Sequence, residues 1–198
     1  REKGESGLMK NTSIKEKAYK FFYLGCLVFS FLAAVKMLLA GFCMDEEYVL
    51  VMSYRHLIGD DLLGTMWEPH QTSAFVCSVL MRLFCMLTGG TTGVVLFLRV
   101  VTTGIQFLLA LWLTRRLSTV LKREYAFLLG CCYFNMVPKI IQIPEFSNLQ
   151  LWFLTVTVLA MMEYYSLPVR RGLKAKGWLV VAGLGMALEV LAYPASLI

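Results

Sequence analysis

The stretch CMDEEYVLVMSYRHLIGDDLLGTMWEPHQTSAF, residues 43–75, contains six of the 13 acidic residues of the chain. It follows the first long apolar run of a sequence that is 58% hydrophobic and only 16% charged. A soluble globular protein is about half apolar and about a quarter charged. With a mean hydropathy of +0.66, this composition indicates a polytopic membrane protein, so the side of the membrane on which the acidic stretch lies decides how the chain is organised.

Long apolar segments predict the membrane spans. A spanning helix needs about 20 mostly apolar residues, and the segments that fit are 19–43, 94–114, 124–141, 147–166 and 178–198. The polar segment 1–18 is expected to be a cytoplasmic N-terminal segment. Because the chain stops inside an apolar run, we expect 19–198 to be the N-terminal part of a transmembrane domain that continues further.

A sixth apolar segment, 72–88, is short and contains Arg82. If it does not cross the membrane, eight basic residues of two later loops lie on the cytoplasmic side, as the positive-inside rule prefers. If it crosses, all eight lie outside. We therefore predict that 72–88 is an interfacial helix within one external loop, 44–92. The eight residues are Arg115, Arg116, Lys122, Arg123, Arg170, Arg171, Lys174 and Lys176.

A second surface helix is predicted over 46–58. Apolar residues recur there at the spacing of one helix face, at Leu50, Val51, Tyr54, Leu57 and Ile58. The predicted fold is thus an all-α polytopic transmembrane helix bundle with interfacial helices in its first external loop. The net charge of +6 does not indicate a nucleic-acid partner, because the basic residues border the apolar segments, where membrane topology explains them.

Several short motifs follow one another in a distinctive order. They are Asp45-Glu46-Glu47-Tyr48, Gly59-Asp60, Trp67-Glu68-Pro69 with Phe75, Arg99 in FLRVVTTG, the basic RRLSTVLKR, and the glycine-bearing KGWLVVAGLGMALEVLAYPASLI. This order resembles the GT-C superfamily of membrane glycosyltransferases, in the branch of protein O-mannosyltransferases and lipid A aminoarabinose transferases. The resemblance covers nearly the whole chain.

The chain departs from that branch at three places. Relatives often have Glu-Lys-Pro where this chain has Glu68-Pro69-His70. They have an Asp in the second external loop, where Glu145 and Asn148 are rival counterparts here. A Thr-Lys-Gly near the end of the last span reads Ala192-Tyr193-Pro194. The substrate class is therefore open to differ from that of the named enzymes.

The resemblance implies transfer of a sugar from a polyprenyl-phosphate-linked donor to a glycan, lipid or protein acceptor at the extracytoplasmic face, in the plasma membrane. Asp45 would be the catalytic base, with Glu46 as the alternative, because a carboxylate at the membrane surface suits proton abstraction from a hydroxyl. Arg99 and Lys139 would meet the phosphate or structure the site. Glu68, His70 and Glu145 would bind the acceptor or a divalent metal ion, and the metal requirement stays open.

Other readings of the same residues remain open. Asp45, Glu46 and Glu47 also suit a solvated acidic start of a helix, and Glu68 with Pro69 suits a turn before a helix. A transporter or flippase of a lipid-linked or small polar substrate is the alternative function, although transporters tend to place charges near the membrane midplane on broken helices. An inactive transferase-like subunit is the third possibility.

Overall fold

The computed structural model describes residues 2–61, 63–66 and 71–193, and every regular element in these residues is a helix. The elements are α1 (Glu2–Leu38), α2 (Met44–Leu57), α3 (Gln71–Thr88), α4 (Val94–Leu117), α5 (Arg123–Phe134), the short 3₁₀ helix η1 (Pro138–Ile140), α6 (Phe146–Tyr165) and α7 (Leu173–Ala192). The prediction of an all-α fold is confirmed.

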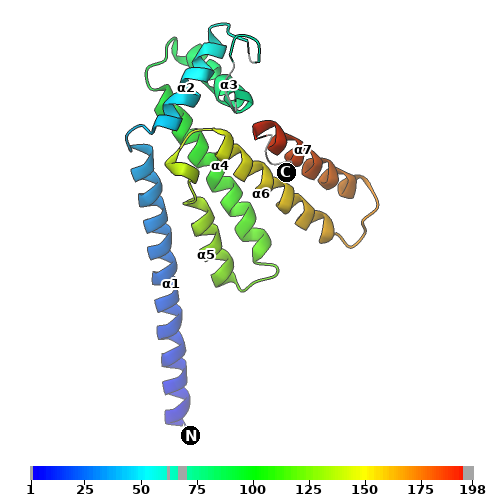
Figure 1. Ribbon diagram of the computed structural model, residues 1–198. Coiled ribbons are helices and arrows are strands. Elements are labelled where there is room, and N and C mark those ends of the chain that lie inside the picture. Colours follow the sequence, from blue (N-terminus) through cyan, green and yellow to red (C-terminus); the bar gives the residue numbers. More distant parts are fainter. Residues whose placement is uncertain (1, 62, 67–70, 194–198) are drawn as a thin grey trace.

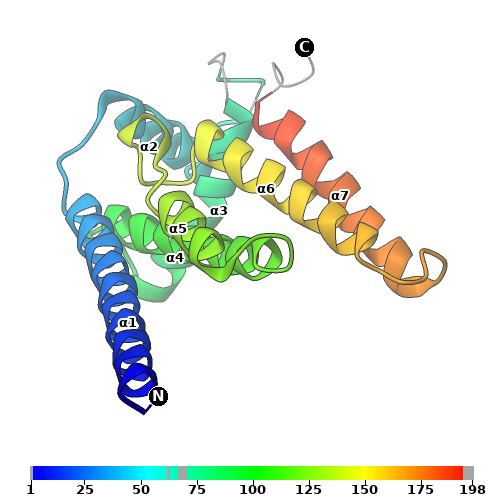
Figure 2. The same ribbon diagram turned by 90° about the horizontal axis from the view of Figure 1, so that it is seen from below.

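α1 and α4 run in opposite directions. Arg99, near the start of α4, donates a hydrogen bond of 3.0 Å to the carbonyl of Leu38 at the end of α1. Further along both helices, the rings of Phe31 and Phe107 lie 5.7 Å apart. The segment 39–93 therefore begins and ends at the same end of the bundle, and α2 and α3 lie across that end (Figures 1 and 2).

The bundle has two ends of opposite character. α4 packs against both α5 and α6, and α6 packs against α7; along the chain, the helices from α4 to α7 alternate in direction (Figure 1). We call the end that holds residues 39–93 and 135–145 the acidic end. We call the end that holds the segment 115–123, around the α4–α5 turn, and the segment 166–176, around the α6–α7 loop, the basic end. All eight basic residues considered above lie in these two segments.

Four helices among the described residues are long and apolar enough to cross a membrane: Ala18–Leu38, Gln71–Thr88, Val94–Leu117 and Leu173–Ala192. They indicate a membrane protein. Gln71–Thr88 belongs to this set by its length and composition, whereas the antiparallel arrangement of α1 and α4 supports its predicted position on the surface. That position stays a prediction.

The predicted span boundaries need correction. The first span ends at Leu38 rather than residue 43, and α7 begins at Leu173 rather than residue 178. The predicted span 124–141 is not one continuous helix. α5 has only 12 residues, or about 18 Å at the rise of an α-helix, which is shorter than the roughly 30 Å hydrocarbon core of a bilayer.

The early end of α5 is stabilised by a side chain from α4. Gln106 Nε2 donates to the carbonyl of Tyr133 (2.7 Å) and to that of Met136 (3.3 Å). Gln106 Oε1 in turn accepts a hydrogen bond of 2.6 Å from Trp152 Nε1 of α6. Carbonyls released where a helix ends in an apolar environment need such partners, so Gln106 permits the irregular segment 135–145.

α2 confirms the predicted helix but packs by a different face. Its buried side contains Val49, Met52 and Ser53, and Ser53 Oγ donates to the carbonyls of Val49 and Ala74 at 2.7 and 3.2 Å. The predicted stripe points mainly outward, since Ile58 is 64% exposed. An outward apolar stripe is what a helix resting on lipid requires.

Labelling of single cysteines in a cysteine-free background tests the topology. Cysteines at the exposed positions Asp61 and Met136 are expected to react from one side of the membrane, and those at Ser118 and Gly172 from the other, since the former belong to the acidic end and the latter to the basic end. Labelling at Asp61 and Ser118 from the same side would mean that α3 crosses the bilayer.

Close packing of α6 against α7 depends on Gly185. A Cβ atom at this position would lie 2.4 Å from Thr157 Oγ1 and 3.1 Å from the carbonyl oxygen of Phe153. We expect Gly185→Val to destabilise the protein by about 1–3 kcal/mol, the usual cost of overpacking, measured by thermal unfolding in detergent. Gly183→Val is the matched control, because nothing lies within 4 Å of its Cβ position. Equal stability of the two variants would contradict this packing.

Candidate functional site at the acidic end

A buried ion pair joins α2 to α4 at the acidic end. Arg99 Nη2 lies 2.7 Å from Glu46 Oε2, and Arg99 Nε lies 2.9 Å from Glu46 Oε1. The side chains are only 7% and 2% exposed, respectively. Two parallel hydrogen bonds of this kind are the strongest pairing that an arginine and a carboxylate form.

The same guanidinium also fastens the turn between α1 and α2. Arg99 donates to the carbonyls of Leu38 (3.0 Å), Ala40 (2.6 Å) and Gly41 (3.2 Å). A guanidinium has five N–H groups, and these bonds together with the two to Glu46 use all five. In this arrangement Arg99 positions the start of α2 and has no donor left for a phosphate.

Asp45 and Glu46 are neighbours with opposite environments. Glu46 is 1% exposed and bound to Arg99, whereas the Asp45 side chain is 56% exposed. Both stand in the first turn of α2 with Glu47, where carboxylates favour the positive end of the helix dipole. Of the two predicted catalytic acids, Asp45 is therefore the one that is accessible from solvent. Glu46 instead binds Arg99, which fixes the turn between α1 and α2.

Lys139 brings the second connection of the acidic end to Asp45. Lys139 Nζ lies 4.0 Å from Asp45 Oδ2 and 4.1 Å from the centre of the Phe146 ring. The backbone angle φ is +54° at Lys139 and +64° at Ile140, a region that side chains other than glycine rarely adopt. Backbone strain of this kind persists only where surrounding contacts impose it, and here it directs the lysine toward Asp45.

The aromatic ring beneath Lys139 belongs to a stacked pair. Phe146 at the start of α6 and Tyr193 just after α7 have ring centres 5.3 Å apart and planes inclined by 19°. The pair joins the end of α7 to the connection that carries Lys139, so three distant parts of the chain meet beside Asp45.

Glu145 lies at the same end but is fully buried. Its Oε1 accepts a hydrogen bond of 2.9 Å from the backbone N–H of Asn148 and another from the Ser147 hydroxyl, so it caps the start of α6. Its Oε2 has no hydrogen-bond partner among the described residues. The predicted role of Glu145 in binding an acceptor or a cation stays a prediction, because it requires an access route that this arrangement does not provide.

Asn148, the other residue considered for the acid position of the second external loop, also stabilises the local backbone. Its amide donates to the carbonyls of Ile141 and Ile143, each at 2.8 Å. It thereby satisfies two backbone groups of the irregular segment that leads into α6, as a buried polar side chain should.

The other predicted motifs are those that contain Asp60, Glu68 and His70. Glu68 and His70 lie outside the described residues. Asp60, of the predicted Gly-Asp turn, forms an ion pair of 2.6 Å with Arg55 at the end of α2. Among the described residues, no group of three or more His, Cys, Asp or Glu side chains could hold a metal ion.

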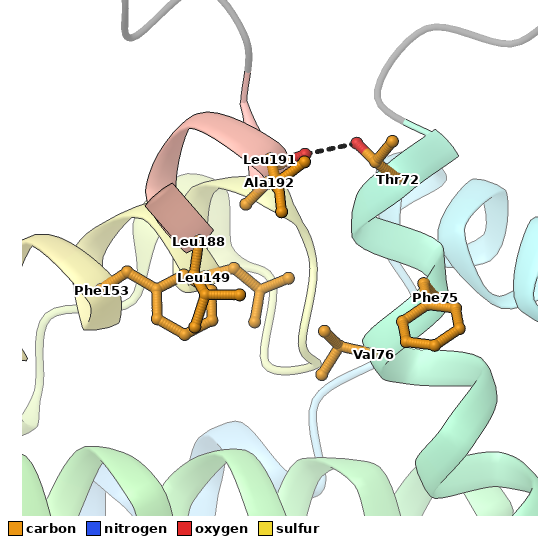
Figure 3. Close-up of a pocket in the computed structure, with 8 residues that line it drawn as sticks. All are labelled: Thr72, Phe75, Val76, Leu149, Phe153, Leu188, Leu191 and Ala192. Carbon is orange, nitrogen blue, oxygen red and sulfur yellow. Dashed lines mark hydrogen bonds between the residues drawn. The ribbon is translucent and has the colours of Figure 1, made fainter. Parts of the chain in front are cut away.

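An apolar groove opens between α3, α6 and α7 (Figure 3). Its volume is about 300 Å³, and its walls comprise Thr72, Phe75, Val76, Leu149, Phe153, Leu188, Leu191 and Ala192. Thr72 Oγ1 donates a hydrogen bond of 2.5 Å to the Leu191 carbonyl across its rim (Figure 3). Tyr193 follows the last of these residues, so the groove adjoins the aromatic pair.

Sequence reasoning missed several residues that build this end. The stacking of Tyr193 on Phe146 gave no signal, because single aromatic residues are common in apolar segments. Gln106 could have been found, since a polar amide inside a membrane span is rare and usually has a partner. Asn135 and Pro138 together are an ordinary sign that a helix ends, and they lie within the predicted span 124–141.

No protein-family model, curated protein or solved structure matches the chain. The resemblance to the GT-C superfamily accordingly stays a prediction that rests on the ordered motifs.

Proposed function

We propose that the chain belongs to a membrane glycosyltransferase that moves a sugar from a polyprenyl-phosphate donor to an acceptor hydroxyl at the acidic end. The observation that carries the proposal is the exposed Asp45 carboxylate with Lys139 Nζ at 4.0 Å. A general base and a cation side by side are what sugar transfer from a lipid phosphate needs, because a proton leaves the acceptor while negative charge develops on the leaving phosphate.

Each residue at the acidic end has a separate role in this proposal. Asp45 takes the acceptor proton, and Lys139 stabilises the departing phosphate. Glu46 and Arg99 hold the turn that carries Asp45 in place, as their buried pairing supports. The apolar groove of about 300 Å³ is suited to the first isoprene units of a donor, since its walls are almost entirely hydrocarbon.

The experiment that tests this function is a transfer assay. The protein is reconstituted in lipid vesicles with a panel of polyprenyl-phosphate sugars, and release of the polyprenyl phosphate together with labelling of acceptors is measured. Transfer that depends on Asp45 supports the proposal. Absence of transfer with every donor, from a protein that is folded and correctly inserted, contradicts it.

A transporter or flippase is the second candidate, favoured by the interruption of α5. The segment 135–145 is irregular, and its last part is buried, with Ile141, Ile143 and Glu145 each 0% exposed. Buried irregular segments between helices also occur at the binding sites of secondary transporters. Movement of a fluorescent lipid-linked sugar across the bilayer without its cleavage would favour this candidate over the transferase.

A further inference from the structure

The basic end carries a concentration of exposed positive charge. Between residues 115–124 and 163–176 the chain has eight basic residues and two acidic ones, Glu124 and Glu163. Glu163 pairs with Arg116, whose Nε lies 3.2 Å from Glu163 Oε1. The other seven basic residues and Glu124 are all exposed: Arg115, Lys122, Arg123, Arg170, Arg171, Lys174 and Lys176.

A groove of about 450 Å³ lies between the α4–α5 turn and α6 at this end. Thr119, Tyr165 and Ser166 give it hydroxyl groups, whereas Val120 and Val158 give it hydrocarbon. A site for one phospholipid needs both, a polar place for the headgroup and an apolar place for the start of the acyl chains.

Two contacts connect the positive charge to this groove. The guanidinium of Arg170 lies 5.1 Å from the centre of the Tyr165 ring, a cation–π distance, and that ring is part of the groove wall. Arg116, also in the wall, donates to the carbonyl of Met162 at 3.1 Å and to the hydroxyl of Ser166. Arg170 thus lies at the rim of the groove, whereas Nη2 of Arg116 already binds protein groups.

We propose that this groove binds the headgroup of an anionic phospholipid such as phosphatidylglycerol. Charge complementarity selects the anionic class, because Arg170 lies against the Tyr165 ring of the groove wall, Lys122 is exposed two residues after Val120, and Arg116 pairs with Glu163. Basic pockets between membrane helices bind such headgroups. The inference does not depend on the proposed glycosyl transfer, which is located at the other end of the bundle.

The chain contains its own reporter for the test. The rings of Trp112 and Trp178 lie 6.0 Å apart near the basic end, and Trp112 Nε1 donates a hydrogen bond of 3.3 Å to Glu163, the partner of Arg116. Brominated lipids quench tryptophan fluorescence over short distances. Trp112→Phe identifies the part of the signal that comes from this position.

The protein is reconstituted in phosphatidylcholine vesicles in which brominated phosphatidylglycerol or brominated phosphatidylcholine is introduced stepwise. Half-maximal quenching of the Trp112 signal is expected at a mole fraction about fivefold or more lower for the anionic lipid, since one basic group near a membrane surface contributes about that factor. Arg170→Gln and Lys122→Gln should each reduce the preference, and Arg170→Lys should retain most of it.

Arg82→Gln is the matched control, because Arg82 is an exposed arginine on α3 at the acidic end; it should leave the preference unchanged. Equal quenching by the two brominated lipids would overturn the proposal, as would a preference that persists in Arg170→Gln/Lys122→Gln. Loss of the preference in Arg82→Gln would locate the lipid elsewhere and would overturn it too. Circular dichroism of each variant separates loss of binding from loss of fold.

Discussion

Replacement of Arg99 by methionine is expected to destabilise the protein by about 3–5 kcal/mol, because it leaves the buried Glu46 carboxylate without its partner. The Glu46 side chain is only 2% exposed, so water cannot replace the lost bonds. The carbonyls of Leu38, Ala40 and Gly41 lose their donor as well. Thermal or denaturant-induced unfolding in detergent measures the effect.

The control is the other ion pair of α2. Arg55 and Asp60 lie 2.6 Å apart with side chains 39% and 34% exposed, and a pair this accessible contributes about 0–1 kcal/mol. Arg55→Met should therefore cost far less than Arg99→Met. The double variant Arg99→Met/Glu46→Leu should recover part of the loss, because removing both charges abolishes the buried unpaired one. An Arg99→Met protein as stable as Arg55→Met would contradict the role given to this pair.

The helices and their alternation could be predicted from hydropathy, because membrane spans are long and their charged boundaries alternate. The choice between Asp45 and Glu46 could not. Successive residues of a helix point about 100° apart, so the two carboxylates can have different environments. The partner that buries Glu46, Arg99, is 53 residues away in the sequence. A contact of that kind is not visible in local periodicity.

The end of α5 could not be predicted from hydropathy either. Hydropathy extends the predicted span to residue 141, because Ile140 and Ile141 are apolar. The structure ends the helix at Phe134, and Gln106 of α4 binds the carbonyls of Tyr133 and Met136 on either side of that point. The break places Lys139 in the short 3₁₀ helix η1 instead of a spanning α-helix, and its Nζ lies 4.0 Å from Asp45 Oδ2. Tertiary hydrogen bonds therefore decide where the cation of the candidate site lies.

Asp45→Asn is expected to lower sugar transfer by about 10²–10⁴-fold, the usual contribution of a general base, which corresponds to about 3–5 kcal/mol of activation free energy. Asparagine keeps the size of the side chain but cannot accept the proton. Stability should change little, since the Asp45 side chain is 56% exposed and its ion pair with Lys139 spans 4.0 Å. The measurement is the initial rate of transfer in reconstituted vesicles.

Glu47→Gln separates a base from a general effect of negative charge, because Glu47 is an exposed carboxylate of the same helix turn. If the three acids merely favour the start of α2, Asp45→Asn and Glu47→Gln should have equal and small effects on the rate. If Asp45 is the base, Asp45→Asn lowers the rate strongly and Glu47→Gln does not. Glu46→Gln should instead lower stability, since its carboxylate binds Arg99. Near-normal transfer by a folded Asp45→Asn protein would therefore refute the base assignment and favour the interpretation of the three carboxylates as a helix start.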